Sequence, residues 1–333
     1  MSTWITRRRF AGTAAGLGAA TLLSSAESRA QASGQIQATG QIKVMGNRVA
    51  SFYSPLIATV AGGFLKAEGL DPSFRWLGTV NYAEAIRKGS ADVLQNAISS
   101  NWTASEAGQT DLPVHIAQIN GRDGFFLVRR GKGGKFHWKD LEGKTLIAEN
   151  YGQPLTMLKY ALFYNKVDIA KVNIVNAGNT EAIYAAFKSG KGDFIQAQGP
   201  EPQQIELDGF GTVVVSVGGS IPPVAFSSVC SSRAFVSGPL YKPFLRAFAK
   251  SKDWCQNAPA KEIADKLKTF LPEFGVPALA ASIGQYQKMG TWKGGIAIPA
   301  AQHEQAVDVF LWAKGIQRRH TFDEACVQPP NVA

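Results

Sequence analysis

Cysteine and histidine are scarce in this 333-residue sequence, which holds three cysteines and four histidines. Cys230, Cys255 and Cys326 lie far apart and form no Cys-x-x-Cys pair, which excludes a zinc knuckle and a thioredoxin-type motif. Formation of one disulfide in an oxidising compartment is an alternative, but isolated buried thiols are the simpler expectation. The histidines lack metal-binding spacing, and His303 beside Glu304 is expected on an exposed helix face. We therefore expect neither a metal nor another cofactor.

The motifs of common enzyme classes are also missing. The segment Gly143-Lys144-Thr145 resembles the end of a phosphate-binding loop, but Trp138 stands where that loop needs a glycine. No Gly-x-Gly-x-x-Gly opens the first strand-helix unit, and neither Gly-x-Ser-x-Gly nor His-Glu-x-x-His occurs. A catalytic pair of acids could still assemble in space. These absences favour a binding protein over an enzyme.

Long hydrophobic runs and dense basic clusters are absent as well. No apolar run reaches membrane-spanning length. No Lys/Arg cluster is interleaved with aromatic residues, so nucleic acid is not an expected partner. The formal net charge is nevertheless +10, and the first 32 residues contribute three of these charges. A positive body favours encounter with anionic partners without identifying them.

The N-terminus has the three parts of an export signal. Three arginines at positions 7–9 precede Phe10, an apolar stretch covers residues 11–23, and Ala30-Gln31-Ala32 forms a small-x-small cleavage site. The paired arginines before Phe10 resemble the twin-arginine signal that exports folded proteins, although an ordinary secretory signal with an incidental arginine pair is the alternative. We expect cleavage after Ala32.

Strand and helix patterns alternate through the rest of the chain. Strands are predicted at residues 41–46, 71–77, 91–94, 112–119, 125–130, 144–149, 172–175, 193–197, 212–217 and 224–229. Helices are predicted between most of them, including one over residues 54–69 that Gly69 ends, and helices alone follow residue 230. The alternation predicts an α/β protein with largely parallel sheets.

A chain of 333 residues exceeds the size that a single hydrophobic core usually supports, so two lobes are expected. The two strand-helix series have a similar order. We predict that residues 33–128 and 223–333 form one lobe and residues 129–222 the other. The chain would then cross between the lobes twice, which makes a hinge.

Four segments resemble a known family in the same order along the chain. They are SPLIATVAGGFLKAEGLD at residues 54–71, EAIRKGSADV at 84–93, WKDLEGKT at 138–145 and AAFKSGKGD at 185–193. They are similar to segments of the periplasmic substrate-binding proteins of nitrate/sulfonate/taurine-type ABC transporters. The same superfamily contains the thiamine-pyrimidine binding proteins. The match covers most of residues 41–230.

The resemblance implies a two-lobe periplasmic-binding-protein fold of the type II kind, with the ligand in a cleft between the lobes and two hinge crossings. It implies a periplasmic monomer that is not an enzyme, captures a small molecule and delivers it to an ABC permease and its ATPase. Two alternatives remain. One is a sensor that partners a receptor. The other is an enzyme like the yeast-type pyrimidine synthase, which is disfavoured because no cysteine-rich iron motif is present.

Polar residues at strand ends of the first lobe are candidate ligand contacts, because ligands of α/β sheets lie beyond the carboxyl ends of strands. Tyr53 and Ser54 follow the first strand, where Ser54 before Pro55 is equally a helix cap. A hydrogen-bonding cluster follows the third strand, and its candidate contacts are Asn96, Ser99 and Ser100.

The second lobe offers similar junctions. Tyr151 and Gln153 precede a predicted helix, and Gln198 and Glu201 precede another. Glu201 either complements the helix dipole or selects a ligand with N–H donors. Arg122 either pairs with a ligand sulfonate or carboxylate, or with its neighbour Asp123.

These candidates disagree about the ligand. The positive body and Arg122 favour an anion, with a sulfonate-like molecule as the best guess. Glu201, the amides and the tyrosines favour a pyrimidine or another ring that carries N–H groups.

Overall fold

The computed structural model describes residues 40–149, 152–178 and 180–332. The predicted export signal at residues 1–32 and the predicted contact Tyr151 lie outside the described residues. Within these residues, no helix combines the length and the apolar character needed to cross a membrane.

The first sheet has five strands in the order β2-β1-β3-β10-β4. They are β1 (Gly40–Gly46), β2 (Leu70–Trp76), β3 (Val93–Asn96), β4 (Val114–Asn120) and β10 (Ser227–Ser231). β1 pairs in parallel with β2 and β3, whereas β10 is antiparallel to both β3 and β4.

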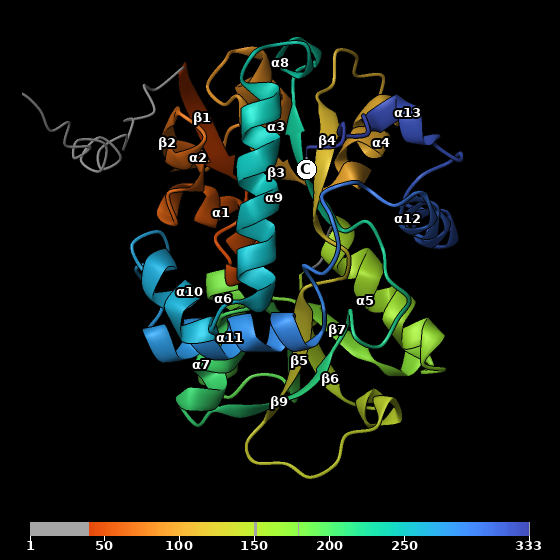
Figure 1. Ribbon diagram of the computed structural model, residues 1–333. Coiled ribbons are helices and arrows are strands. Elements are labelled where there is room, and N and C mark those ends of the chain that lie inside the picture. Colours follow the sequence, from red (N-terminus) through yellow and green to blue (C-terminus); the bar gives the residue numbers. More distant parts are fainter. Residues whose placement is uncertain (1–39, 150–151, 179, 333) are drawn as a thin grey trace, which may run out of the picture. The chain divides into compact units, whose positions relative to one another are not determined.

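The second sheet repeats this plan in the order β7-β6-β8-β5-β9. Its strands are β5 (Phe125–Arg130), β6 (Thr145–Ala148), β7 (Asn173–Asn176), β8 (Phe194–Gln198) and β9 (Gly211–Ser216). β6 is parallel to β7 and β8, and β5 is antiparallel to β8 and β9. Figure 1 shows the second sheet below the first.

All ten predicted strands are present within a few residues of their predicted bounds, and the α/β class is confirmed. The expectation of largely parallel sheets holds for four of the five strands in each sheet, which run in one direction, whereas β10 in the first sheet and β5 in the second run the opposite way. β5 and β10 are the strands that arrive directly from the other sheet. Neither follows a helical crossover within its own sheet, which is what a parallel neighbour requires, so each enters antiparallel.

Helices occupy most of the predicted intervals. They are α1 (Ser54–Ala61), α2 (Phe64–Ala67), α3 (Tyr82–Arg87), α4 (Ile98–Glu106), α5 (Gly152–Tyr164), α6 (Thr180–Lys188), α7 (Glu201–Leu207), α8 (Arg233–Val236), α9 (Tyr241–Asn257), α10 (Ala260–Leu267), α11 (Val276–Lys288), α12 (Ala300–Trp312) and α13 (Phe322–Ala325), with 3₁₀ turns η1 (Ser51–Tyr53), η2 (Trp138–Leu141) and η3 (Ile169–Lys171).

The predicted helix over residues 54–69 is divided in two. Gly63 between α1 and α2 has φ +76°, a left-handed conformation that glycine adopts readily and that ends an α-helix. Gly69 has the same φ and ends α2 as predicted.

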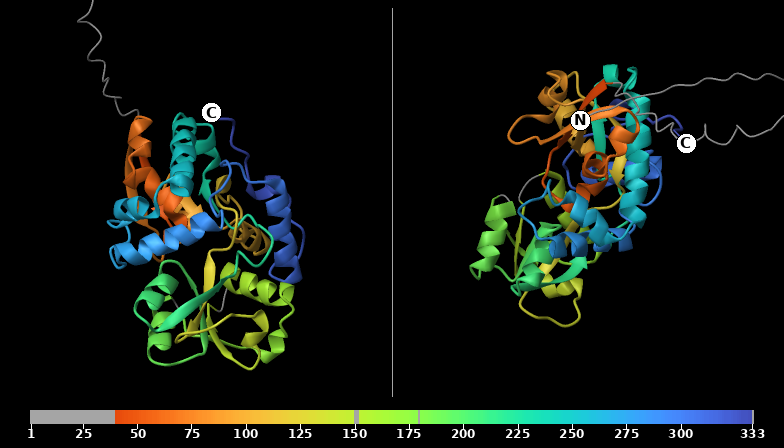
Figure 2. Two further views of the ribbon diagram at one scale, coloured as in Figure 1. Left: turned by 60° about the horizontal axis from the view of Figure 1, so that its bottom comes forward. Right: turned by 60° about the vertical axis from the view of Figure 1, so that its left-hand side comes forward.

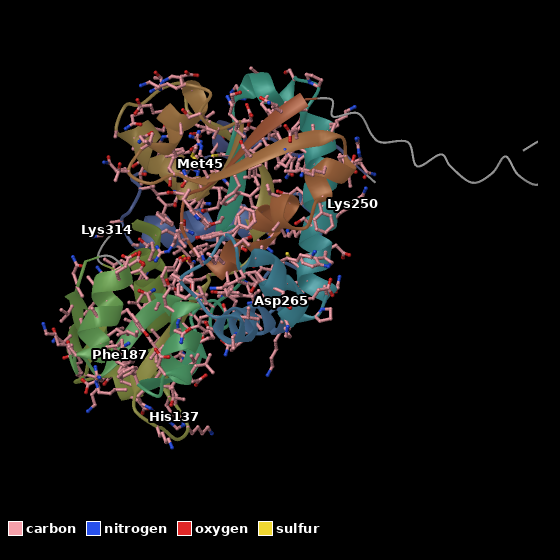
Figure 3. The ribbon with its side chains drawn as sticks, turned by 90° about the vertical axis from the view of Figure 1, so that its left-hand side faces the viewer. Met45, His137, Phe187, Lys250, Asp265 and Lys314 are labelled. Carbon is pink, nitrogen blue, oxygen red and sulfur yellow. The ribbon has the colours of Figure 1, made fainter. Side chains whose placement is uncertain are left out.

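Each sheet buries side chains on both faces. Val44 and Met45 are consecutive in β1 and enter separate buried clusters, as expected from strand alternation. In the second sheet, Phe194 joins the main core while Ile195 packs with Phe187 of α6. Figure 3 labels Met45 of β1 and Phe187 of α6, which packs against the second sheet. The near-continuous hydrophobic strands follow from this two-sided burial.

The C-terminal helices contact elements of both sheets. α9 packs on α1 and α2, and α11 contacts both η1 and α7. Figure 1 shows α11 between α9 and the second sheet. α12 contacts α4 and α5, and Figure 2 shows it beside α5. The predicted lobe boundaries stay a prediction, since residues after 223 supply β10 to the first sheet and also contact α5 and α7 beside the second.

The three cysteines are free and buried. His303 is fully buried, and its ring lies 5.4 Å from that of Trp102. The expected exposure of His303 is therefore wrong, because α12 turns this position inward while Glu304 faces solvent.

Two short connections carry the chain between the sheets: residues 121–124 link β4 to β5, and residues 217–226 link β9 to β10. They touch at Gly218, where a Cβ would lie 2.1 Å from the backbone oxygen of Asp123. The Tyr286 hydroxyl donates to the Gly124 carbonyl at 2.8 Å and accepts from the Gly199 amide at 2.8 Å. The Tyr286 bonds hold the first connection and the end of β8 against α11.

We predict that Gly218→Ala lowers the free energy of unfolding by roughly 1–3 kcal/mol, because the added methyl must push the two connections apart. Gly219→Ala is the matched control, since the nearest atom to its Cβ is 3.4 Å away. Its effect is expected to stay within about 1 kcal/mol. Urea denaturation of both variants measures this difference, and equal stabilities would contradict the close packing of the connections.

Candidate functional site

A cavity of about 1030 Å³ lies where the carboxyl ends of β1, β3 and β6 meet the starts of α6 and α7. Its walls come from both sheets and from the loop that follows α10. The lining residues are Asn47, Arg48, Val49, Tyr53, Gly78, Gln95, Asn96, Ala97, Ser100, Phe125, Glu149, Gly152, Gln153, Pro154, Thr180, Glu181, Tyr184, Glu201, Gln204, Asp208, Phe226, Ser227, Glu273 and Phe274. This is the position in which α/β sheets bind small molecules.

An ion pair spans the cavity from one sheet to the other. Arg48 follows β1, and Glu149 follows β6. The two guanidinium terminal nitrogens of Arg48 donate to the two carboxylate oxygens of Glu149, one of them at 3.0 Å. Arg48 also donates to the Thr180 hydroxyl at 3.2 Å, and its guanidinium lies 5.1 Å from the ring centroid of Phe125.

The pair is largely removed from water, with 27% of the Arg48 side chain and 5% of the Glu149 side chain exposed. Burial alone would lower the pKa of Arg48, but the hydrogen bonds and charge of Glu149 outweigh it and raise that pKa above its ordinary value. The charge of Arg48 is therefore matched inside the cavity.

The loop after β1 is held by side chains from the end of β3. The Gln95 side-chain oxygen accepts from the amides of Asn47 and Arg48 at 3.0 and 3.1 Å. The Asn96 side-chain oxygen accepts from Asn47 at 3.2 Å and from Ser100 at 3.3 Å. The Asn96 amide nitrogen is buried and has no partner among the described residues, so it is available to a ligand.

Glu201 begins α7 and contributes a carboxyl whose Oε2 is buried without a partner among the described residues. Burial raises the pKa of Glu201 to about 8. The carboxyl is therefore largely neutral at pH 7, and one group offers both an acceptor and an O–H donor. Burial likewise raises the pKa of Tyr53.

Acidic residues outnumber basic ones in the lining. Glu181, Asp208 and Glu273 are exposed members of the wall, and Arg48 is the sole lining Lys or Arg within the described part of the chain. Tyr184 donates to Asp208 at 2.7 Å. The cavity is therefore poor in unpaired positive charge.

Five of the ten predicted contact residues line the cavity: Tyr53, Asn96, Ser100, Gln153 and Glu201. Two others lie immediately behind the wall. Ser99 donates to the Gln153 side-chain oxygen at 2.9 Å, and the Gln198 amide lies 3.5 Å from the Tyr53 hydroxyl. Their ligand contacts stay predictions.

Ser54 and Arg122 lie elsewhere. The Ser54 hydroxyl donates to the Ser51 carbonyl at 2.5 Å, because the side chain turns back along η1 at the start of α1. Arg122 donates to the Gly218 carbonyl at 3.1 Å and lines a different cavity. Asp123 accepts from the Phe125 amide at 2.7 Å instead of pairing with Arg122.

The sequence analysis missed Arg48 and Glu149, the strongest electrostatic feature of the site. Each follows the last residue of a parallel strand by one or two positions, where cavity residues are expected. That signal was present in the sequence. The pairing between residues 101 positions apart is visible only after folding.

We predict that Arg48→Met lowers the free energy of unfolding by roughly 2–4 kcal/mol, because it leaves the Glu149 carboxylate buried without its partner. The double variant Arg48→Met/Glu149→Met removes both charges and is expected to recover most of that loss. Urea denaturation of Arg48→Met, Glu149→Met and the double variant gives the coupling free energy between the two side chains. A double variant that is less stable than Arg48→Met would contradict this account.

Three comparisons relate the chain to known proteins. It is 28% identical over 247 residues to the "Putative binding protein YtlA" of Bacillus subtilis (strain 168), covering 72% of this chain and 74% of that one. A ligand-binding component of an ABC-type import system from Staphylococcus aureus, solved with zinc bound, matches with a TM-score of 0.69 at 12% identity over 87% of this chain and 97% of that one. The alkanesulfonate-binding protein SsuA from Xanthomonas axonopodis pv. citri, bound to MOPS, matches with a TM-score of 0.65 at 14% identity over 86% and 98%.

The structural matches confirm the periplasmic-binding-protein fold that the four sequence segments predicted. The family model described as NMT1/THI5 like matches residues 46–262, which is more than half of the chain. The protein therefore belongs to the NMT1/THI5-like family.

Proposed function

We propose that the protein is the exported solute-binding component of an ABC importer and that its two sheets close around one small molecule. The cavity bridged by Arg48 and Glu149 is the observation that carries the proposal, because its walls come from both sheets. Family membership and the fold shared with import-system binding proteins support it.

The charges of the cavity favour a ring with N–H groups over an anion. Arg48, the one Lys or Arg among the described lining residues, is engaged by Glu149, and Arg122 lies outside this cavity. A sulfonate would have to bind near several carboxyl groups without a free cation, which is unfavourable. The sulfonate expectation is thus less well supported than its alternative.

The Glu201 carboxyl matches one particular hydrogen-bonding pattern. A neutral carboxyl accepts one hydrogen bond and donates another, and an amino group beside a ring nitrogen presents the complementary donor and acceptor. Tyr53 and Phe125 in the same lining supply flat apolar surface for such a ring. An aminopyrimidine-like ligand is therefore our proposal.

The protein would act as a monomer that delivers its ligand to a permease and its ATPase, and it would not act on the ligand chemically. Genes for an ABC permease and an ATPase beside its own would support delivery, whereas a neighbouring receptor gene would support a sensor. Turnover of the bound ligand would contradict a purely binding role.

We predict that 4-aminopyrimidine raises the melting temperature of the protein in a concentration-dependent way, because a ligand of the folded state stabilises it. Glu201→Met is expected to weaken binding at least about tenfold, since it removes both hydrogen bonds. Glu201→Gln keeps an acceptor and a donor and is expected to bind within about threefold to fivefold of the wild type. Calorimetric titration measures all three affinities.

Glu262→Gln, at an exposed position of α10 outside the cavity lining, is the control and should leave binding unchanged. Ethanesulfonate, nitrate and benzoate are the competing ligand classes. A response to one of these and none to aminopyrimidines would overturn the ligand class while leaving the binding function intact. Equal loss in the Gln and Met variants would show that an ionised carboxylate is required.

Export is proposed from residues 7–32, which lie outside the described residues. We predict that the full chain is found in the periplasm of a Gram-negative host, and that Arg8→Lys/Arg9→Lys keeps it in the cytoplasm because the twin-arginine receptor no longer accepts it. Cell fractionation and immunoblotting make the measurement. Normal export of the double-lysine variant would indicate an ordinary secretory signal.

A further inference from the structure

A second, smaller cavity of about 360 Å³ lies beside the two connections between the sheets. The first connection contributes Gly121 and Arg122, and the second contributes Pro223. The rest of the wall comes from the end of β4, from α9, from the glycine-rich loop between α11 and α12, and from the start of α12. It shares no lining residue with the larger cavity.

The ionisable side chains of this second cavity are all basic. Arg122, Lys252 and Lys293 line it, and no Asp or Glu is among its described lining residues. None of the three cations takes part in an ion pair with any described residue. Basic groups around one hollow repel each other when all are protonated, and an anion between them relieves that repulsion.

Lys252 is the most informative of the three, because it is a lysine with only 3% of its surface exposed. Its ammonium donates to the carbonyls of Gln118 and Gly295 at 2.9 and 2.7 Å. These two bonds account for two of its three N–H groups, and no carboxylate neutralises it. Burial lowers the pKa of Lys252 to about 7. Loss of the proton relieves part of the cost of burying this ammonium, and an anion beside Lys252 would instead stabilise its charged form.

The start of α12 adds partial positive charge to the same wall. Pro299 caps this 13-residue helix and lines the cavity together with Gln302 of the first turn. Proline cannot supply a side-chain acceptor for the free backbone N–H groups of that turn. The helix dipole therefore favours an anion at this place, in agreement with the three side chains.

We propose that this second cavity is a binding site for a small multivalent oxyanion of the size of phosphate or sulfate, held by Arg122, Lys252 and Lys293. Arg122 also donates to the Gly218 carbonyl of the other connection, so a bound anion would tie both connections to α9 and to the loop before α12. The site is separate from the larger cavity and does not depend on the ligand proposed there.

The test measures the melting temperature of the full chain against phosphate and against sulfate, at an ionic strength held constant with chloride. The expected result is a saturable rise for both oxyanions, with one phosphate bound per chain in equilibrium dialysis. Lys293→Gln and Arg122→Gln are each expected to weaken phosphate binding roughly tenfold or more, since each removes a charge-assisted contact.

Lys288→Gln is the matched control, because Lys288 is an exposed lysine at the end of α11 and does not line the cavity. It should bind phosphate as the wild type does. Lys293 is also exposed, so its substitution should not impair folding even where a Lys252 variant does.

Three outcomes would overturn the proposal. One is a phosphate response no larger than that to chloride, and another is an unchanged response in Lys293→Gln. The third is a phosphate response that is lost in Glu201→Met and retained in Lys293→Gln, because the anion would then occupy the larger cavity.

Discussion

The two connections between the sheets are the constraint on which the rest of the molecule depends. They are packed so closely that Gly218 has no room for a side chain beside Asp123. The Tyr286 hydroxyl bonds the Gly124 carbonyl and the Gly199 amide, so α11 is tied to a connection and to the end of β8. This arrangement decides which strand ends of the two sheets face one another.

The two cavities differ in how their charges are balanced. In the larger one, Arg48 is matched by Glu149, and the remaining buried carboxyl, Glu201, avoids a charge by keeping its proton. In the smaller one, three basic side chains line the wall and no Asp or Glu is among the described lining residues. The larger cavity therefore suits an uncharged polar ring and the smaller one an oxyanion, although the whole chain carries a net charge of +10.

The strands could be predicted because their hydrophobic patterns are local. Residues of β1 alternate between two buried clusters, and the glycines at 69 and 89 end helices with positive φ angles. Local patterns fail where distant residues decide the outcome. His303 has a polar neighbour on either side, yet it is buried because Trp102 and Phe322 pack against its ring. The reversed direction of β10 escaped prediction for the same reason, since its pairing with β3 and β4 is a property of the assembled sheet.

What the sequence by itself determined is the order of the elements, the family and the polar strand ends that surround the solute cavity, because these follow from periodicity, turn residues and short segments. Only the tertiary structure decided which charges meet. Arg48 reaches Glu149 across the two sheets, Arg122 turns toward Gly218, and Lys252 is buried between two carbonyls. Electrostatic energy depends on distance and burial, and neither can be known before residues far apart in the chain are brought together.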